Sequence, residues 1–193
     1  MQRICVYAGS NRGVRQEYRQ AAQTLGSELV SRGLGLVYGG GRAGLMGIIA
    51  DAVLAAGGEV IGVMPRALFP QEIAHPGITT LHEVANMHER KALMADLADG
   101  FVALPGGTGT YDELFEILTW AQLGIHQKPI GLLNVAGYFD PLLALLHHTM
   151  TEGFVASEHL ELLLHNESAA ELLDRLARYV PPPRHSKWTD LAP

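Results

Sequence analysis

The chain has 193 residues, of which 48% are hydrophobic and 22 are glycine. This length and composition are typical of one globular α/β domain and argue against a fibrous or disordered chain. The formal net charge of −6 argues against a protein that binds nucleic acid or a membrane surface through a basic face.

Short apolar runs alternate with helical patterns along the chain. In chain order, the patterns predict a strand at 3–9, a helix at 15–31, a strand at 33–41, a helix at 44–58, strands at 59–65 and 78–84, a helix at 87–99, a strand at 100–105, a helix at 110–123, a strand at 128–134, and helices at 138–153 and 168–179. Strands that are apolar throughout and separated by helices are typical of a parallel sheet. We therefore expect one α/β domain over residues 1–180, with a parallel sheet and helices on both faces, followed by a proline-led tail at 181–193.

Cysteine usage and apolar runs bear on where the protein works. Cys5 is the only cysteine and lies in an apolar run, so we expect it in the core. A chain with one cysteine cannot form an internal disulfide, which fits a reducing cytoplasm. The N-terminal apolar run is too short for a signal peptide, and no apolar stretch approaches the length of a membrane span. The expectation is a cytoplasmic protein.

Two predicted strand-to-helix junctions are rich in glycine, at 39–47 (GGGRAGLMG) and 105–110 (PGGTGT). Glycine permits positive φ and a close approach of ligand to backbone, and the following helix directs free N–H groups at the same place. Because crossovers are right-handed, the loops at the carboxyl ends of the strands share one edge of the sheet. These loops predict a phosphorylated ligand, with Gly40, Gly41 and Ser10 among the candidate contacts. Ser10 ends the first strand and is either a donor to the ligand or a cap of the next helix.

Other interpretations of the glycine loops have to be weighed. The first loop matches the G-x-G-x-x-G pattern of dinucleotide sites, but the acidic residue expected at the end of the next strand is absent, since that strand ends Met64-Pro65-Arg66. The second loop is not a P-loop, because no Gly-Lys-Ser/Thr follows it. Thr110 and Glu113 have the spacing of a helix capping box, so Glu113 is either a cap partner or a functional residue. Capping alone would not require three glycines.

Arg90 and Glu113 have positions in the sequence that favour a catalytic role. Arg90 borders the apolar face of the predicted helix 87–99, and none of its neighbours three or four residues away is acidic. A partly buried guanidinium in this setting needs a partner from tertiary structure or from a ligand. Lys91 either serves the same ligand or lies in solvent. Glu113 is expected in the first turn of the next helix, where the dipole favours a carboxylate. A carboxylate and an arginine beside a phosphate site suit the cleavage of a glycosidic bond, whose transition state resembles an oxocarbenium ion.

Metal and serine-hydrolase chemistry are not indicated by the sequence. The nine histidines are scattered, and the chain has no His-Glu-x-x-His motif and no cysteine–histidine cluster. We therefore expect no metal site. Ser10 lacks the Gly-x-Ser-x-Gly setting of a hydrolase nucleophile.

The segments PGGTGTYDE and MHERK resemble the PGGxGTxxE and MHxRK motifs of the Lonely Guy family, the cytokinin-activating phosphoribohydrolases. YGGGRAGLMG and LTWAQLGIHQKPIGLLN are also similar to this family, and the resemblance covers residues 4–145. The paired motifs are far more specific than either glycine loop alone. Many relatives carry the name lysine decarboxylase, but the sequence has no lysine in a pyridoxal-binding context.

The resemblance implies a Rossmann-like domain that forms a homodimer and needs no cofactor. The implied activity is hydrolysis of the N-glycosidic bond of a nucleoside 5′-monophosphate, with free base and ribose 5-phosphate as products. The family's substrates are cytokinin riboside 5′-monophosphates and AMP. By matching motif, Arg90 and Glu113 would be the catalytic pair. The implied nucleotide contacts are Lys91, Gly106, Gly107, Thr108, Gly109 and Thr110, with Glu72 and Thr119 as further positions.

Small departures from the family pattern leave the base preference open. Thr108 and Asp112 stand where many relatives have an apolar or aromatic residue and Glu, and Ala43 replaces Val. Two alternatives to the hydrolase remain. One is a non-catalytic nucleotide-binding or cofactor-carrier module, which the presence of both Arg90 and Glu113 argues against. The other is an NAD-dependent oxidoreductase, which would bind a nicotinamide cofactor.

Overall fold

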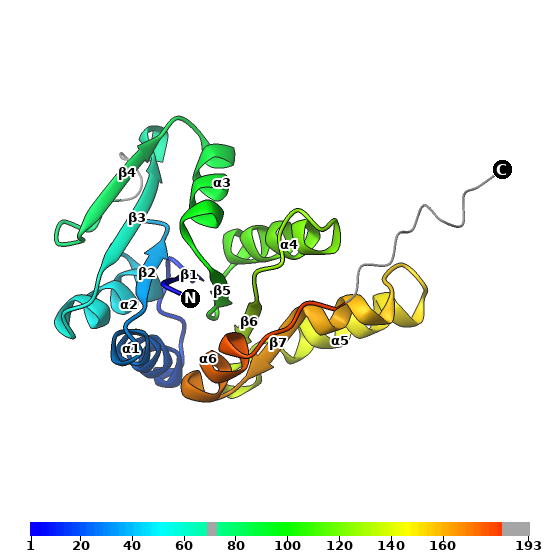
Figure 1. Cartoon of the computed structure of the whole chain (residues 1–193). Helices are drawn as coiled ribbons and strands as arrows, with labels where there is room; N and C mark the ends of the chain where they lie inside the picture. Colours follow the sequence, from blue (N-terminus) through cyan, green and yellow to red (C-terminus); the bar gives the residue numbers. More distant parts are fainter. Residues whose placement is uncertain (69–72, 183–193) are drawn as a thin grey trace.

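A parallel sheet runs through the centre of the molecule (Figure 1). The structure, a computed structural model, describes residues 1–68 and 73–182. Within these residues seven strands form one sheet in the order β4-β3-β2-β1-β5-β6-β7, and each neighbouring pair is parallel. The strands are β1 (Arg3–Tyr7), β2 (Gly35–Tyr38), β3 (Val60–Pro65), β4 (Thr80–Val84), β5 (Gly100–Ala103), β6 (Ile130–Leu133) and β7 (Leu163–Asn166).

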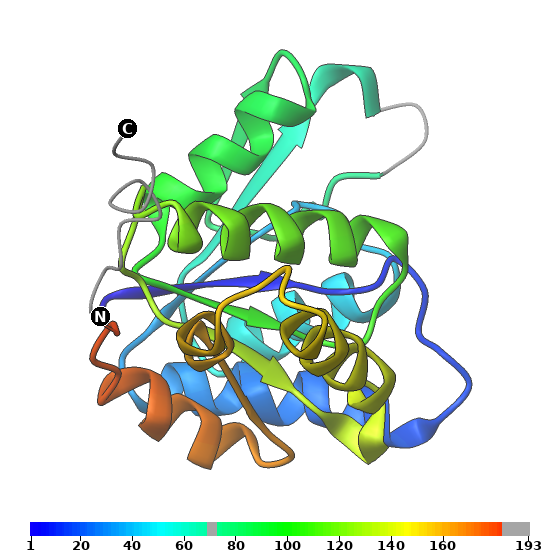
Figure 2. The ribbon, with the colours of Figure 1, turned by 90° about the vertical axis from the view of Figure 1, so that its right-hand side faces the viewer.

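Helices cover both faces of the sheet (Figures 1 and 2). One face carries α1 (Gln16–Ser31), α2 (Gly44–Ala55) and α6 (Ala169–Ala177). The other carries α3 (Met87–Leu97), α4 (Thr108–Gln122) and α5 (Asp140–Thr151). Short 3-10 turns occur at Arg66–Leu68, Val135–Gly137 and Ser157–Leu162. In the part of the chain that the structure describes, no helix is both long and apolar enough to cross a membrane.

Successive residues of the central strand β1 face opposite layers of the core. Ile4 and Val6 pack with α1, α2 and α6, whereas Cys5 and Tyr7 pack with α3, α4 and α5. All four side chains are buried, and Cys5 is in the core as expected. Because both faces are covered, every position of such a strand is apolar, which is why the strands appear in the sequence as continuous apolar runs.

The predicted parallel sheet with helices on both faces is confirmed, and β1 to β6 and the six helices lie near their predicted positions. Strand β7 was not predicted. It is an edge strand that pairs only with β6 among the described residues, and it is half-buried with a polar end at His165 and Asn166, so it lacks a continuous apolar run. Most of the predicted tail at 181–193 lies outside the described residues, and the boundary at 180 stays a prediction.

The strand order reverses between β1 and β5, which are neighbours at the centre of the sheet. The chain passes from β1 to β2 on one side, but from β5 to β6 on the other. Loops that leave the sheet in opposite directions open a crevice between them, which is where ligands bind in open α/β sheets. Here the two loops stay in contact, since the Gly9 N–H donates to the Pro105 carbonyl at 3.1 Å. The topology therefore places a candidate site above β1 and β5.

Candidate active site

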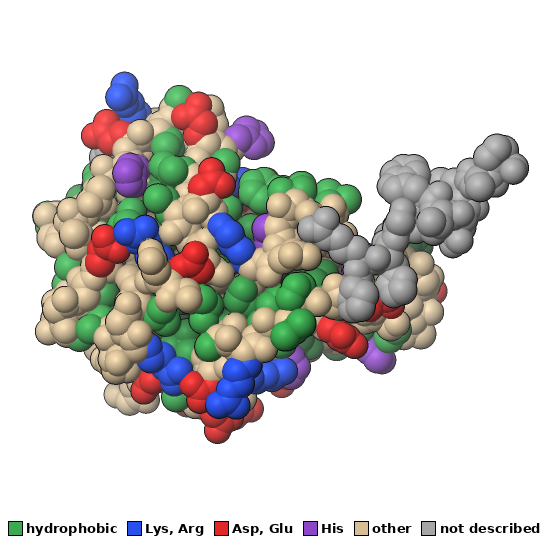
Figure 3. Space-filling model, in the orientation of Figure 1, with side chains coloured by type: hydrophobic (Ala, Val, Ile, Leu, Met, Phe, Trp, Pro, Cys, Tyr) green, Lys and Arg blue, Asp and Glu red, His purple; other side chains and the backbone are tan. Residues whose placement is uncertain are grey.

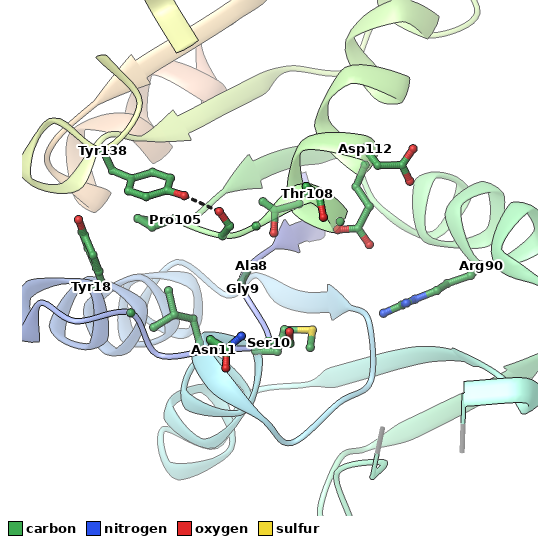
Figure 4. A pocket seen from close by; sticks show the side chains of 18 of the residues that line it. Ala8, Gly9, Ser10, Asn11, Tyr18, Arg90, Pro105, Thr108, Asp112 and Tyr138 are labelled. Atoms are coloured by element: carbon green, nitrogen blue, oxygen red, sulfur yellow. Dashed lines mark hydrogen bonds between the residues drawn. The ribbon is translucent and has the colours of Figure 1, made fainter. Parts of the chain in front are cut away.

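A cavity of about 500 Å³ lies at this crevice, within the usual range for small-molecule sites. Its walls come from the loops after β1 and β5, the first turns of α2 and α4, one face of α3, and two tyrosines. Figure 4 shows Tyr18 and Tyr138 at one end of the cavity and Arg90 at the other, with the loop after β1 between them. A cavity lined by tyrosines on one side and by a guanidinium on the other can orient a ligand (Figure 4).

The loop after β5 forms the part of the wall that suits phosphate. Gly107 is the N-cap of α4 in an extended conformation, with φ −97° and ψ −158°, and the first N–H groups of a helix have no partner within it. A Cβ at Gly106 would lie 2.1 Å from Thr110 Oγ1, so only glycine fits there. A Cβ at Gly107 or Gly109 would meet no atom within 4 Å. These two glycines therefore keep free the space in front of the exposed amides.

Arg90 lies at the end of the cavity opposite Tyr18 and Tyr138 (Figure 4). Its side chain is buried, with only 5% exposed. Its Nη2 donates to the Gly39 carbonyl at 2.9 Å, and its Nη1 lies 3.8 Å from the Met87 sulfur. Its Nε is buried and has no hydrogen-bond partner among the described residues. Buried donors are rarely left without an acceptor, so an unpartnered guanidinium nitrogen at a cavity indicates a ligand.

Gly39 explains part of the first glycine loop. A Cβ at Gly39 would lie 1.9 Å from Arg90 Nη2, closer than any non-bonded contact allows. The glycine therefore makes room for the guanidinium of α3. Gly44, with φ +63°, plays a similar part for the loop after β1, because a Cβ there would lie 2.2 Å from the backbone of Ser10.

Glu113 lies on α4 and lines the same cavity as Arg90. The prediction that it sits in the first turn is wrong, because α4 begins at Thr108 and its first turn holds no acidic residue. The capping-box alternative is wrong for the same reason, since Gly107 is the N-cap and Thr110 is already inside the helix. The dipole effect falls off beyond the first turn. What brings the carboxylate to the site is the face of α4 on which it lies.

The core beneath the site is apolar and uncharged. Tyr7 ends β1 at 3% exposure, and its ring stacks on Phe101 with centroids 6.0 Å apart. Burial raises the pKa of Tyr7 well above its ordinary value, and the nearby Cys5 and Glu113 raise it further. Tyr7 is therefore neutral. The charges of Arg90 and Glu113 lie next to an apolar core, where electrostatic interactions are stronger than in water.

Lys91, the neighbour of Arg90, does not line the cavity. Its Nζ lies 3.1 Å from a carboxylate oxygen of Asp112 and 3.1 Å from one of Glu116, so it ties α3 to α4. Burial lowers the pKa of Lys91, but hydrogen bonds to the two carboxylates outweigh this effect and raise it above its ordinary value. The ammonium is thus fully charged, and a direct contact with nucleotide stays a prediction.

The remaining candidates divide between the cavity and other places. Ser10 lines the cavity together with the loop 106–110. Gly40 and Gly41 do not: Gly40 has φ +81° and packs near Leu81, while Gly41 forms a bridge with Ala74. Thr119 is exposed in the later part of α4, and its hydroxyl donates to the Phe115 carbonyl at 2.7 Å. Glu72 lies outside the described residues.

In the described ranges, no group of three or more histidine, cysteine or acidic side chains is placed to hold a metal ion.

Several cavity residues escaped the sequence interpretation, above all Tyr18 and Tyr138. Tyr138 follows β6, the strand beside β5. The loop after β6 therefore leaves the same edge of the sheet as the loop after β5. That topology was the available signal for Tyr138. Tyr18 lies on α1 and reaches the cavity by packing against Tyr138, a contact that no sequence pattern indicates.

Comparison with known proteins places the chain in a family. A protein-family model described as "Possible lysine decarboxylase" matches residues 46–176. Cytokinin riboside 5′-monophosphate phosphoribohydrolase LOG of Oryza sativa subsp. japonica is 51% identical over 179 residues, 93% of this chain and 74% of the rice protein. The corresponding LOG1 of Arabidopsis thaliana is 51% identical over 185 residues, 96% of this chain and 86% of that protein. The chain belongs to the Lonely Guy family. The resemblance carried by the two motifs is thereby confirmed.

The decarboxylase description of this Lonely Guy protein's family model does not fit the site. Pyridoxal enzymes hold their cofactor as a Schiff base with a lysine. Of the described residues, Lys91 and Lys128 are the lysines, and neither lines the cavity. Lys91 is held by its two carboxylates, and Lys128 Nζ donates to the Ala95 carbonyl at 2.7 Å.

Solved structures share the fold of this Lonely Guy protein at low sequence identity. The molybdenum cofactor carrier protein of Chlamydomonas reinhardtii has a TM-score of 0.68 at 18% identity, over 92% of this chain and 99% of that chain. The molybdenum cofactor binding protein of Rippkaea orientalis has a TM-score of 0.66 at 21% identity, over 92% and 95%. Likenesses at this level show a common fold alone.

Proposed function

We propose that this protein hydrolyses the N-glycosidic bond of nucleoside 5′-monophosphates and releases the free base and ribose 5-phosphate. Cytokinin riboside 5′-monophosphates and AMP are the proposed substrates. The observation that carries the proposal is one cavity that combines the amides at the start of α4 with the buried, partly unpartnered Arg90 and the carboxylate of Glu113. The phosphoribohydrolases of rice and Arabidopsis, about half identical to this chain, support it.

The proposed reaction uses the three groups that share the cavity. The phosphate binds at the amides of 106–110, and the ribose extends toward Arg90 and Glu113. The C1′–N bond breaks with its electron pair leaving on the base, and positive charge develops on the ribose. Glu113 stabilises this charge and orients a water molecule, whose oxygen bonds to C1′. The base gains a proton from that water or from solvent, and the Arg90 guanidinium stabilises the departing base.

Incubation with AMP and with N6-isopentenyl-AMP, followed by chromatography, tests the proposal. We expect free base and ribose 5-phosphate, and the ratio of the two kcat/KM values gives the base preference. Nucleotide binding without release of base would identify a carrier. Tight binding of NAD in place of AMP would identify an oxidoreductase. The cavity does not favour binding of NAD, because Gly40 and Gly41 of the G-x-G-x-x-G loop do not line it.

Gly107→Val tests the phosphate position. The φ of −97° at Gly107 suits any residue, and its Cβ would meet open space, so we expect the unfolding midpoint to change little. The added side chain fills the space in front of the amides and removes charge-assisted hydrogen bonds. We expect the KM for AMP to rise by about 100-fold. Gly77→Val, at a glycine outside the cavity whose Cβ would have only ordinary contacts, is the control. An unchanged KM would place the phosphate elsewhere.

We also propose a homodimer, with α4 and the turn that follows it at the interface. Phe115, Leu123 and Ile125 are large apolar side chains that are 38%, 70% and 64% exposed. Figure 3 shows hydrophobic side chains gathered over this part of the molecule. Exposed apolar patches of this kind mark interaction sites. Light scattering after size-exclusion chromatography should give twice the chain mass, and Leu123→Glu should give a monomer. A monomeric wild-type protein at micromolar concentration would refute this proposal.

A cytoplasmic location is also proposed. Cys5 is buried and unpaired, a state that is typical of proteins in a reducing compartment. Fractionation of cells with an antibody against the chain tests it, and recovery outside the cytoplasm would refute it.

A further inference from the structure

Tyr138 links the phosphate loop to a different part of the fold. It follows the 3-10 turn Val135–Gly137 after β6, and its hydroxyl donates to the carbonyl of Gly106 (Figure 4). Gly106 belongs to the loop after β5, so the hydrogen bond joins the loops of two neighbouring strands. The backbone of the loop is thus held by a side chain that takes no part in the proposed chemistry.

The turn that carries Tyr138 is fixed by its surroundings. Ala136 has φ +51° and ψ +35°, a left-handed conformation that non-glycine residues adopt only where other contacts enforce it. The buried side chain of Asn134 supplies such contacts. Its Oδ1 accepts from the Phe139 N–H at 2.7 Å, and its Nδ2 donates to Asp140 at 2.7 Å. Phe139 itself is fully buried. Tyr138 therefore projects from a rigid turn.

Aromatic neighbours fix the ring as well as the backbone. The ring of Tyr18 packs edge-on against Tyr138, with centroids 5.7 Å apart and an interplanar angle of 78°. Burial raises the pKa of Tyr111 to about 12, and hydrogen bonding with Tyr138 adds to the rise. Tyr111 is therefore protonated beside Tyr138, and no negative charge there competes with the Gly106 carbonyl for the Tyr138 hydroxyl.

We propose that Tyr138 is a positioning residue that sets the orientation of the Gly106–Gly107 peptide for phosphate binding. In a planar trans peptide the C=O and N–H point in opposite directions. With the Gly106 carbonyl held on Tyr138, the Gly107 N–H points to the other side of the loop. A peptide between two glycines meets few steric barriers to a flip, and the flipped peptide would turn a carbonyl oxygen toward the phosphate and repel it. The inference rests on the proposed function, because that function assigns the phosphate to this loop.

Tyr138→Phe removes the hydroxyl and keeps the ring. We expect the inhibition constant of ribose 5-phosphate and the KM of AMP both to rise by roughly five- to tenfold, the effect of one hydrogen bond that sets the loop. The inhibition constant of adenine and kcat should stay within about twofold, because neither depends on the phosphate contacts. Tyr179→Phe, a matched change outside the cavity, should alter none of these values.

Each other outcome overturns the inference. If wild-type protein hydrolyses AMP and Tyr138→Phe binds ribose 5-phosphate as tightly as wild type, the proposed function stands and the role of Tyr138 falls. If the variant loses adenine and ribose 5-phosphate affinity equally, or melts several degrees lower with a reduced kcat, Tyr138 supports the cavity wall in general. If wild-type protein neither cleaves AMP nor binds ribose 5-phosphate, the proposed function itself fails.

Discussion

Glu113→Gln is expected to lower kcat for AMP by about three orders of magnitude, with the KM within a few-fold of wild type. Glutamine has the same shape, so the cavity and its phosphate contacts stay intact. A neutral amide, however, cannot stabilise the positive charge that develops on the ribose, and it is a weaker acceptor for the attacking water. Steady-state kinetics measure the loss of kcat. Titration of the variant with nucleotide that it does not hydrolyse measures whether binding is retained.

Glu116→Gln is the matched control, since Glu116 lies on the same helix but outside the cavity lining. Its carboxylate pairs with Lys91, and we expect kcat to stay within about threefold of wild type. A near-normal kcat for Glu113→Gln would reduce Glu113 to an ordinary helical carboxylate. The catalytic carboxylate would then have to be sought elsewhere on the cavity wall.

Arg90→Met should slow hydrolysis strongly without weakening the fold. We expect kcat/KM to fall by about three orders of magnitude, because the guanidinium is the cation placed at the proposed bond cleavage. The free energy of unfolding should fall by no more than about 1 kcal/mol, and it could even increase. The variant loses the hydrogen bond to Gly39, but it no longer buries a charge whose Nε lacks a partner among the described residues.

Arg32→Met gives the opposite pattern and serves as the control. Arg32 follows the C-terminal end of α1, outside the cavity lining, and pairs with Glu28 and Asp174. Its loss should therefore cost up to about 1 kcal/mol of stability and leave kcat/KM unchanged. Chemical denaturation and kinetics on both variants decide the matter. A marked loss of stability in Arg90→Met with nucleotide binding retained would mean that Arg90 is a structural residue.

The central strands could be predicted from the sequence because burial on both faces requires apolar residues at every position, as in β1 with Ile4, Cys5 and Val6. The edge strand β7 could not, because its half-buried end is polar. The start of α4 was misplaced because Thr110 and Glu113 have capping-box spacing, whereas Gly107 caps the helix through backbone conformation alone. Backbone conformation of this kind leaves little trace in residue type.

A residue of the candidate cavity could be predicted from the sequence where its residue type lacked a local explanation. Arg90 has no acidic residue three or four positions away on its helix, and the structure buries it with one nitrogen unpartnered by the described residues. Gly40 and Gly41 in the first glycine loop were predicted to contact the ligand, but they pack against the protein itself. Glycine permits close packing as readily as ligand contact, so the residue type alone does not distinguish the two. Tyr138 could not be predicted because the loop that its hydroxyl contacts is brought near only by the strand order.

The close fit between Gly39 and the guanidinium of Arg90 couples two positions far apart in the sequence. Any side chain at 39 would occupy the volume of Nη2, so a protein of this fold with a larger residue there must have lost the cation or moved it. A side chain at that position therefore excludes an arginine at position 90 in the orientation seen here.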